Sequence, residues 1–479
     1  MDDLHGITYA DGPDTRASPL THAPAEPHIV IIGAGFSGTL LAINVLRHDG
    51  PRVTLIERHG DQLARGVAYS AADPTHLLNV RASNMSALRD DPGHLVRWLA
   101  ARGQGAPQAF IPRILYGTYL QDMLSQAQAS ARASGQGRLT VLAGAVQGVV
   151  ANAAGYRVDL ADGSSLLADK VVLAVGNLPP HTPPGLDPDL LPTRSYAQDP
   201  WAADIAEGLS ESDTVMLLGT GLTAIDAALL LDRAGFRGRI LAMSRRGVVP
   251  RAHLAEGPAV QGRSERLRGP LSKIVKLIRR RSTQVDWRAA VDELRPMTQM
   301  MWGGADIDTR ARFLRHLRPF WDVHRHRLAP EVADQIAQLQ ASGRLTFAAG
   351  KIVEAQADGN GVRLTWRPRG GTAISVSHAR RVVNCTGPQG DLLRTGEPLL
   401  KALLDAGQIR PDVLRLGLDV DAQSRVVDAA GVAQERLLCI GPMTRGGMWE
   451  VVAVPDLRIQ SWDLARRLSN AHWEGGEGL

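Results

Sequence analysis

The chain has 479 residues, of which 44% are hydrophobic and 22% are charged. This composition is ordinary for a globular protein, and the length exceeds what one hydrophobic core supports, so two or three domains are expected. No apolar run reaches the roughly 20 residues that a membrane-spanning helix needs. Residues 1–27 are polar, rich in proline and without a secretory pattern, so they are expected to form a disordered arm.

The positive charge of the chain is concentrated in one stretch. Between residues 263 and 288 there are nine Lys and Arg but only two acids, whereas the whole chain has a net charge of +5. The rest of the chain is therefore slightly acidic, which argues against general nucleic-acid binding. A solvated helix face, an acidic partner or an anionic surface remain open for this stretch.

Two cysteines, Cys385 and Cys439, each lie in an apolar run that is typical of a strand. Their spacing fits neither a CxxC redox pair nor a zinc site, so we expect buried packing and no metal. This argues against a disulfide reductase and fits a reducing cytoplasm, so a cytoplasmic location is expected.

Residues 28–57 read as a strand, a glycine turn, a helix and a second strand. Gly33 permits the tight turn, Gly35 lets the backbone approach a pyrophosphate, and Gly38 lets the helix pack closely on the strand. Glu57 lies 22 residues after Gly35, where an acid accepts hydrogen bonds from a ribose. The stretch therefore predicts a dinucleotide site.

The segment 61–88 is too irregular for one helix, and long irregular segments within compact domains are often functional. We expect its parts 65–69 and 79–81 to run alongside an extended cofactor. A surface excursion is the alternative.

Residues 138–176 and 344–387 share one pattern: a strand, a pair of alternating runs broken by turns, and a closing apolar strand that ends in Gly. A repeat about 206 residues apart indicates that the same supersecondary unit is built twice. Each copy is expected to close one nucleotide-binding module.

A second glycine turn follows the strand at 215–218, with Ala224 in place of the third glycine. The next strand ends in Ser244, Arg245 and Arg246, where the first module has Glu57. An acid would repel a 2′-phosphate, whereas a hydroxyl and guanidinium groups bind it, so we predict FAD at the first site and NADPH at the second. A solvated loop is the alternative. The predicted NADP-binding residues are Gly219, Gly221, Leu222, Thr223, Ala224, Ser244, Arg245 and Arg246.

The fold is expected to be α/β, with two Rossmann-like three-layer dinucleotide-binding domains of the glutathione-reductase type. An FAD-binding domain is assigned to 28–180 and 380–470. An NADP-binding domain is assigned to 181–379, with a basic helical insertion at 251–343.

Five motifs carry a family resemblance: GAGFSG with Glu57, AVG at 174–176, GTGLTA followed by SRR, CTG at 385–387, and IGP at 440–442. This arrangement resembles the two-dinucleotide-binding flavoproteins, which include class B flavin monooxygenases, amino-acid N-hydroxylases and pyridine-nucleotide reductases. The runs GVAYS, HLLNVRASNM, RHLRPFWDVHRHR and GPMTRGGMWEVVAVPDLR are similar to the bacterial FAD-NAD(P)-binding family. The resemblance covers nearly everything after residue 27.

The resemblance also implies particular site residues. The FAD-binding residues are Gly33, Gly35, Phe36, Ser37, Gly38, Glu57, Arg58, Arg65, Gly66, Val67, Tyr69, Asn79, Val80, Val146, Gly176, Gly441, Trp449 and Glu450. Arg81, Asn84 and Trp449 are the candidates for the substrate side, because they lie in the irregular segments expected near the flavin ring. The FxGxxxH fingerprint of Baeyer–Villiger monooxygenases is absent before the second turn, which disfavours ketone or sulfide oxygenation.

The preferred function is an NADPH-dependent FAD monooxygenase that uses O2 to hydroxylate a nitrogen or sulfur centre of a small molecule. The alternative is an NADPH:acceptor reductase that passes electrons to a quinone or a partner protein. A more distant alternative is an RNA-binding or RNA-modifying flavoprotein.

Overall fold

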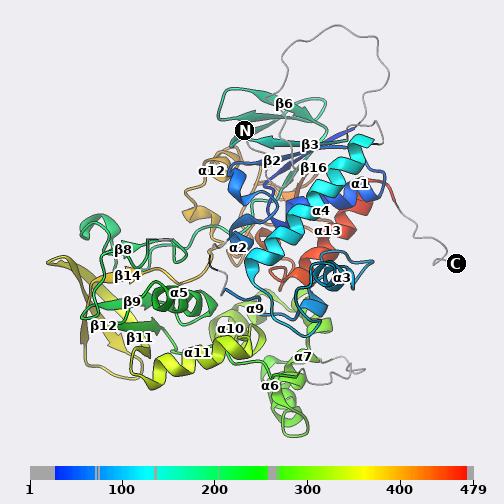
Figure 1. Ribbon diagram of the computed structural model, residues 1–479. Helices are drawn as coiled ribbons and strands as arrows, with labels where there is room; N and C mark the ends of the chain where they lie inside the picture. Colours follow the sequence, from blue (N-terminus) through cyan, green and yellow to red (C-terminus); the bar gives the residue numbers. More distant parts are fainter. Residues whose placement is uncertain are drawn as a thin grey trace, which may run out of the picture. The chain divides into compact units, whose positions relative to one another are not determined.

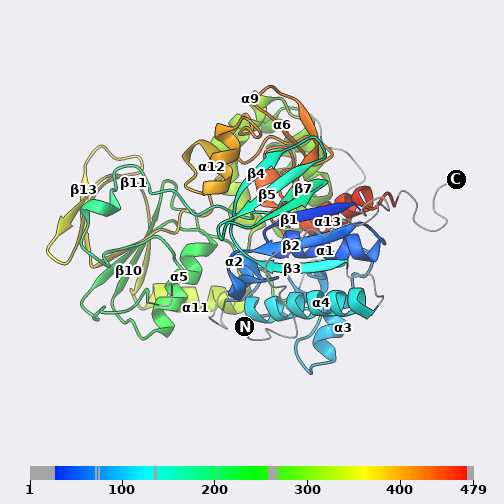
Figure 2. The same ribbon diagram turned by 90° about the horizontal axis from the view of Figure 1, so that it is seen from above.

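The computed structural model describes residues 27–70, 73, 76–133, 138–202, 204–256, 267 and 269–471. Apart from Pro27, the expected N-terminal arm lies outside these residues, as does part of the basic stretch 263–288. The chain forms two compact units (Figures 1 and 2). Unit 1 consists of Met1–Ala71, Arg81–Leu178 and Gly390–Leu479, and unit 2 of Ala72–Val80 and Pro179–Gln389.

Unit 1 is built on a six-stranded sheet in which all strands but one edge strand run parallel. Across the sheet the order is β15 (Arg425–Val427), β16 (Ala433–Cys439), β7 (Lys170–Leu173), β1 (His28–Ile32), β2 (Arg52–Glu57) and β3 (Leu139–Ala143). Ile32 pairs with both Ile56 and Leu173. This register brings the glycine turn after β1 level with Glu57 at the end of β2.

Helices and a second sheet cover the two faces of this sheet (Figure 2). On one face α1 (Phe36–Arg47) packs against α4 (Arg113–Ala133) and α13 (Val454–Leu468). Side chains of the other face, including Val30 and Val171, share a core with the three-stranded sheet and with α12 (Pro398–Asp405). That sheet contains β4 (Val146–Ala151), β5 (Tyr156–Leu160) and β6 (Ser165–Ala168). Unit 1 therefore has three layers, as expected for a dinucleotide-binding domain.

The irregular segment 61–88 contains short helices within its described residues. An aromatic cluster holds α2 on α4: the ring of Tyr69 lies 4.8 Å from that of Tyr116 and 6.3 Å from that of Phe36. The short elements of this unit are η1 (Gly60–Gln62), α2 (Gly66–Tyr69), η2 (Ala82–Asn84), α3 (His94–Ala100), η6 (Leu392–Arg394) and η7 (Pro442–Thr444).

Unit 2 is built on a seven-stranded sheet. Its parallel part contains β11, β10, β9, β14 and β8, and α5 (Leu222–Arg233) packs on β9. The order across the sheet is β13 (Ser375–Ala379), β12 (Gly361–Pro368), β11 (Leu345–Asp358), β10 (Arg239–Ser244), β9 (Thr214–Leu218), β14 (Arg381–Val383) and β8 (Tyr196–Ala197). The turn η3 (Pro188–Leu190) precedes β8. The predicted α/β fold with parallel sheets is confirmed.

The two copies of the repeat differ in how their strands join. In unit 1, β3 and β4 are separate, and β4 belongs to its own small sheet. In unit 2, one 14-residue strand, β11, replaces both, so that the hairpin extends the main sheet. The predicted return to the first domain at residue 380 is too early, because β14 pairs with β9 in unit 2; unit 1 resumes at Gly390.

Between β10 and β11 the described chain folds into helices. The basic helix α6 turns Ile274, Leu277 and Ile278 into a small core that also contains Leu294 and Met297. The elements are α6 (Leu271–Arg281), α7 (Trp287–Asp292), η4 (Arg295–Met297), α8 (Thr298–Gly303), α9 (Ile307–Arg312), η5 (Phe313–Leu317), α10 (Arg318–Arg325) and α11 (Pro330–Ala341). None of the helices in the described residues is both long and apolar enough to cross a membrane.

Candidate functional site

The first glycine turn of unit 1 requires glycine at two positions. Gly33 has a φ of +102°, and a Cβ there would lie 2.4 Å from the backbone oxygen of Ala174, at the end of β7. A Cβ on Gly38 would lie 1.9 Å from the oxygen of Gly33. The first and third glycines of the motif thus allow the turn to close on β7 and on its own helix.

Gly35 has a different role, because its own conformation does not require glycine. Its φ is −73°, and a Cβ there would only touch the Cα of Gly66 at 3.4 Å. Gly66 has a φ of +56°, and its segment is tied to the turn because Ala64 donates its N–H to the oxygen of Ala34 at 2.7 Å. The structure thereby brings 33–38 and 64–66, predicted separately, onto one surface.

Glu57 is buried and attached to the same turn. Its Oε2 accepts the Ala34 N–H at 2.9 Å, and its Oε1 accepts the His59 N–H at 3.1 Å. A carboxylate offers about four acceptor directions, so each oxygen keeps one for a further donor. Two acceptors side by side match the two hydroxyl groups of a ribose.

Arg65 carries an unsatisfied donor beside the turn. Its Nη2 donates to Gln121 at 2.6 Å, but its Nε is buried and has no hydrogen-bond partner among the described residues. Burial lowers the pKa of Arg65 below its ordinary value. An orphaned guanidinium N–H is costly and calls for an acceptor such as a phosphate or a flavin carbonyl.

Tyr69 lies nearby, where its aromatic neighbours keep its hydroxyl un-ionised. Burial raises the pKa of Tyr69 to about 12. Val67, two residues before Tyr69 in α2, is 59% exposed. An exposed apolar side chain next to the glycine turn is available to pack against a ring of a bound cofactor.

The C-terminal part of unit 1 reaches this surface through Gly441, which has a φ of +90°. A Cβ on Gly441 would lie 2.8 Å from Ser37 Oγ. Gln460 fixes the approach, because its Oε1 accepts the Gly441 N–H at 2.9 Å and its Nε2 donates to Thr444 Oγ1 at 2.9 Å. Thr444 lies in the run 441–458 that carries the family resemblance, whereas no motif of the sequence would have revealed Gln460.

Other predicted FAD-binding residues lie apart from the turn or are engaged elsewhere. Arg58 forms a bidentate pair with Glu397, with distances of 2.6 and 3.3 Å. Val146 is partly buried on β4 against the core. Gly176 follows β7 with a φ of +70° and open space at its Cβ position.

Asn79 and Val80 belong to unit 2, although they were predicted beside the flavin. The ring Nε2 of His253 donates to the backbone oxygen of Asn79 at 3.0 Å. By its contacts this segment therefore groups with the second module, and the place of Asn79 and Val80 beside the flavin stays a prediction.

The three residues predicted for the substrate side have different surroundings. Arg81 is buried, donates to the backbone oxygen of Gln108 at 2.8 Å and lies 4.8 Å from the ring centre of Phe110. Asn84 is exposed on η2. Trp449 is buried, and the next residue, Glu450, is a buried acid with a φ of +70°. A non-glycine residue in this conformation costs about 1–3 kcal/mol, and such strain is common at functional sites.

The second glycine turn repeats the first in unit 2. Gly219 has a φ of +141°, and a Cβ there would lie 2.2 Å from the oxygen of Cys385. Gly221 precedes α5 with no side-chain cap among the described residues and with open space at its Cβ position. Leu222 and Thr223 form the first turn of the helix, and Ala224 is buried.

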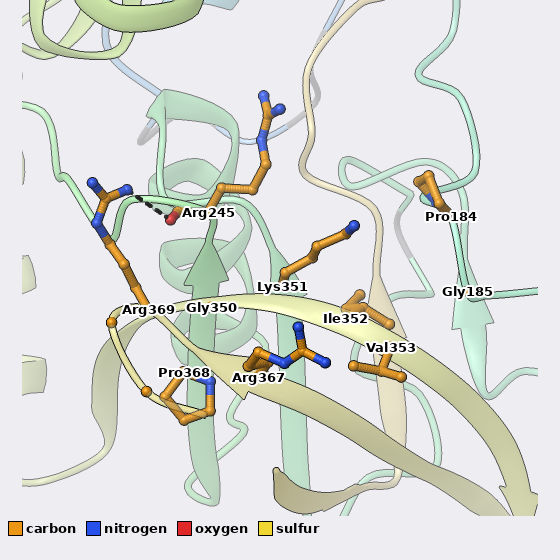
Figure 3. Close-up of a pocket in the computed structure, with 12 residues that line it drawn as sticks. Pro184, Gly185, Arg245, Gly350, Lys351, Ile352, Val353, Arg367, Pro368 and Arg369 are labelled. Carbon is orange, nitrogen blue, oxygen red and sulfur yellow. Dashed lines mark hydrogen bonds between the residues drawn. The ribbon is translucent and has the colours of Figure 1, made fainter. Parts of the chain in front are cut away.

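The three residues of the SRR motif after β10, Ser244 to Arg246, make different contacts. Ser244 Oγ accepts the Gly247 N–H at 2.9 Å and lies 2.8 Å from Thr220 Oγ1. Arg246 donates to the oxygen of Arg315 at 2.8 Å and lies over the ring of Phe320. Arg245 is exposed and lines a pocket of about 470 Å³ (Figure 3).

The cysteines are buried in different units. Burial raises the pKa of Cys439 to about 12 and that of Cys385 further. Because the thiolate is the reactive form, we expect neither to react with 5,5′-dithiobis(2-nitrobenzoate) at pH 8 in the native protein. Two thiols should appear after denaturation; rapid native labelling would contradict this burial.

The residues of unit 1 fit FAD. A side chain at Gly35 or Gly66 would fill the space between these two residues, and no side chain among the described residues caps α1. Glu57 has acceptor directions left for further donors. Arg65 has a buried N–H without an acceptor. A helix start with open N–H groups binds a pyrophosphate. The arrangement therefore has a place for both the diphosphate and the ribose.

Comparison with known proteins agrees with this geometry. Residues 30–178 match the family model described as FAD-NAD(P)-binding. The match contains the first turn, Glu57 and β7, and confirms FAD together with a nicotinamide dinucleotide as the cofactors.

A curated relative, the "Uncharacterized protein YdhS" of Escherichia coli (strain K12), is 23% identical over 255 residues. These are 47% of this chain and 46% of the relative, so the chain spans about half the length of this protein.

Solved structures share the fold over nearly the whole chain. The ornithine N-hydroxylase KtzI of Kutzneria sp. 744, solved with reduced FAD, NADP+ and L-ornithine, has a TM-score of 0.62 at 15% identity, with 94% of this chain and 100% of that chain covered. The L-lysine 6-monooxygenase of Pseudomonas syringae has a TM-score of 0.59 at 17% identity, with coverage of 93% and 99%. The fold is thus that of two-dinucleotide-binding flavoproteins, as predicted.

Proposed function

We propose that the protein is an FAD-dependent monooxygenase that uses NADPH and O2 to hydroxylate an amine nitrogen of a small molecule. The balanced reaction consumes the amine, O2, NADPH and a proton, and yields the N-hydroxylated product, NADP+ and water. The observation that carries the proposal is the pair of glycine turns with opposite charge after the second strand: Glu57 in unit 1 and Arg245 in unit 2.

Two further observations support this reaction. The fold is shared with enzymes whose titles are an ornithine N-hydroxylase and an L-lysine 6-monooxygenase, and it covers those chains almost completely. The buried cysteines lie in different units and are 54 residues apart in the chain, so the dithiol chemistry of a disulfide reductase has no local pair. Sulfur hydroxylation remains the alternative within the same reaction class.

The residues of unit 1 would hold and orient the flavin dinucleotide. The open N–H groups of α1 would hold the diphosphate, Glu57 would accept hydrogen bonds from the ribose hydroxyls, and Arg65 would donate to an acceptor beside α2. When bound, FAD supplies two-electron redox chemistry and activation of oxygen. Tyr69, whose pKa is raised to about 12, stays neutral at physiological pH and adds no charge next to the ring.

The test starts with purified full-length protein. We expect bound FAD, loss of its absorbance on anaerobic addition of NADPH, and much slower loss with NADH. With O2 and a panel containing L-ornithine, L-lysine and other primary amines, one substrate should give an N-hydroxylated product by mass spectrometry. Protein that is purified from FAD-rich medium and holds no flavin would refute the proposal.

A second candidate, an NADPH:acceptor reductase, is favoured by the exposed face of α6. Lys273, Lys276, Arg279 and Arg280 are exposed, and none of them pairs with an acid within the described residues. The apolar side of α6 packs inside its own unit, so the opposite, exposed side of the helix carries the positive charge. Such a surface fits an acidic protein partner.

Salt separates the two candidates. Electron transfer to an acidic partner should fall steeply between 50 and 300 mM salt, and Lys276→Glu/Arg280→Glu should weaken it at low salt, because the attraction is screened. Arg394→Glu, an exposed arginine of unit 1, is the matched control. Amine-dependent hydroxylation without such salt dependence would favour the monooxygenase. Among the described residues we find no feature that singles out the third alternative, an RNA-binding flavoprotein.

A further inference from the structure

The pocket beside Arg245 contains four cations and no acid (Figure 3). Arg245 follows β10, Lys351 lies on β11, Arg367 lies on β12, and Arg369 begins the turn after β12. Arg369 donates to the backbone oxygen of Arg245 at 3.4 Å, which joins the turn to the loop after β10. With Pro184 and Gly185, which also line it, the pocket is formed by four segments of unit 2.

Two of these cations are forced together by the strand register. Lys351 pairs directly with Arg367 in the antiparallel ladder of β11 and β12, so their side chains leave the same face. Side chains that face each other in this way have Cβ atoms about 4.5–5.5 Å apart, and like charges at such positions are destabilising. An anion bound between Lys351 and Arg367 would attract both side chains and offset their mutual repulsion.

No carboxylate of the described residues neutralises these cations. Among the described residues, Arg245, Lys351, Arg367 and Arg369 form no ion pair with a carboxylate. Arg344, which begins the same hairpin, is by contrast paired with Asp232 at 2.6 Å. The four cations of the pocket therefore keep their full positive charge next to one another.

The pocket lies where open α/β sheets bind ligands. Ser244 and Ala349 form the last parallel pair of β10 and β11, and Arg245 and Gly350 follow at once. Ligands of such sheets bind outside the carboxyl ends of the parallel strands. The cations of the pocket therefore lie beyond the carboxyl end of β10, the strand that follows the second glycine turn and α5.

We propose that this pocket binds the 2′-phosphate of NADPH, so that Lys351 and Arg367 of the hairpin, together with Arg245, determine the preference for NADPH over NADH. This inference rests on the proposed function. It replaces part of the motif prediction: Ser244 and Arg246 are engaged by Gly247 and Arg315, whereas Arg245 and the hairpin cations face the pocket. A phosphate monoester carries about two charges and three acceptor oxygens, which suits several cations.

Calorimetry on the full chain with two probes, adenosine 2′,5′-bisphosphate and adenosine 5′-monophosphate, tests the assignment. We expect wild type to bind the bisphosphate more tightly, and Lys351→Ala and Arg367→Ala each to weaken it about tenfold while binding of the monophosphate is unchanged. The bisphosphate should also raise the melting temperature of wild type more than that of either variant.

Two control variants sharpen the result. Arg363→Ala removes an arginine of β12 that does not line the pocket, and it should bind the bisphosphate as wild type does. Arg246→Ala should also retain the preference. Without ligand, Lys351→Ala should melt no lower than wild type, because it removes a repulsion.

The outcomes separate the two levels of the proposal. If wild type prefers the bisphosphate but the hairpin variants keep that preference, the pocket assignment is wrong and the choice of NADPH stands. If wild type shows no preference, both are wrong. If inorganic phosphate binds without competing with the bisphosphate, and Lys351→Ala abolishes that binding, the pocket serves a separate anion and the assignment is overturned.

Discussion

Gly35→Ala is expected to abolish FAD binding while the protein still folds. The new methyl group would meet only the Cα of Gly66, at 3.4 Å, and the φ of −73° suits alanine. It would, however, occupy the surface on which the diphosphate approaches the backbone. We expect FAD affinity to fall at least about 100-fold, or about 2.7 kcal/mol.

Flavin content after purification and titration of the apoprotein with FAD would measure this effect, and circular dichroism would measure the fold. Gly38→Ala is the contrasting variant, since its Cβ would lie 1.9 Å from the Gly33 oxygen and should disrupt the turn itself. Gly35→Ala protein that keeps its full flavin content would show that the dinucleotide does not approach this turn.

Glu57→Gln is expected to weaken both FAD binding and the fold. Both carboxylate oxygens accept backbone N–H groups, from Ala34 and His59. Glutamine has only one oxygen, so its NH2 group would face one of these donors. A buried donor left without an acceptor costs about 1–3 kcal/mol, and one acceptor for the ribose is lost as well.

Denaturant unfolding of the apoprotein and FAD titration separate the two parts of the loss. Arg58→Ala is the matched control from the neighbouring position. Its guanidinium is engaged by Glu397 and its side chain is half exposed, so its removal should change the free energy of unfolding by less than about 1 kcal/mol. A larger loss of FAD in Arg58→Ala than in Glu57→Gln would reverse the roles assigned to these residues.

The two glycine turns could be predicted from the sequence because their determinants are local. The spacing of Gly33, Gly35 and Gly38 describes one turn, and the strand length that follows places Glu57 beside it. The repeat showed that a second module exists, and the second turn was found within it. These patterns can be read from the sequence because a turn and its flanking strands depend little on distant contacts.

The remaining parts of the site depend on distant contacts. Gln460 reaches Gly441 only because α13 packs beside α1, and no motif marks it. Lys351 and Arg367 become neighbours through a hairpin register, which a shift of one residue would have undone. The SRR motif was located correctly, but its sequence could not show that Arg246 turns toward Arg315.

The interrupted course of unit 1 has a consequence for how the protein is made. In its central sheet Leu173 pairs with Cys439, so β7 obtains this neighbour only after 266 further residues have been synthesised. At about 5–20 residues per second, one edge of β7 stays unpaired for roughly 13–53 s, and unpaired strand edges are prone to aggregate. Unit 2 can fold during this interval, because all of its strands lie between the two partners. The proposed flavin site should therefore be completed only after unit 2, when β16 and α13 have been synthesised.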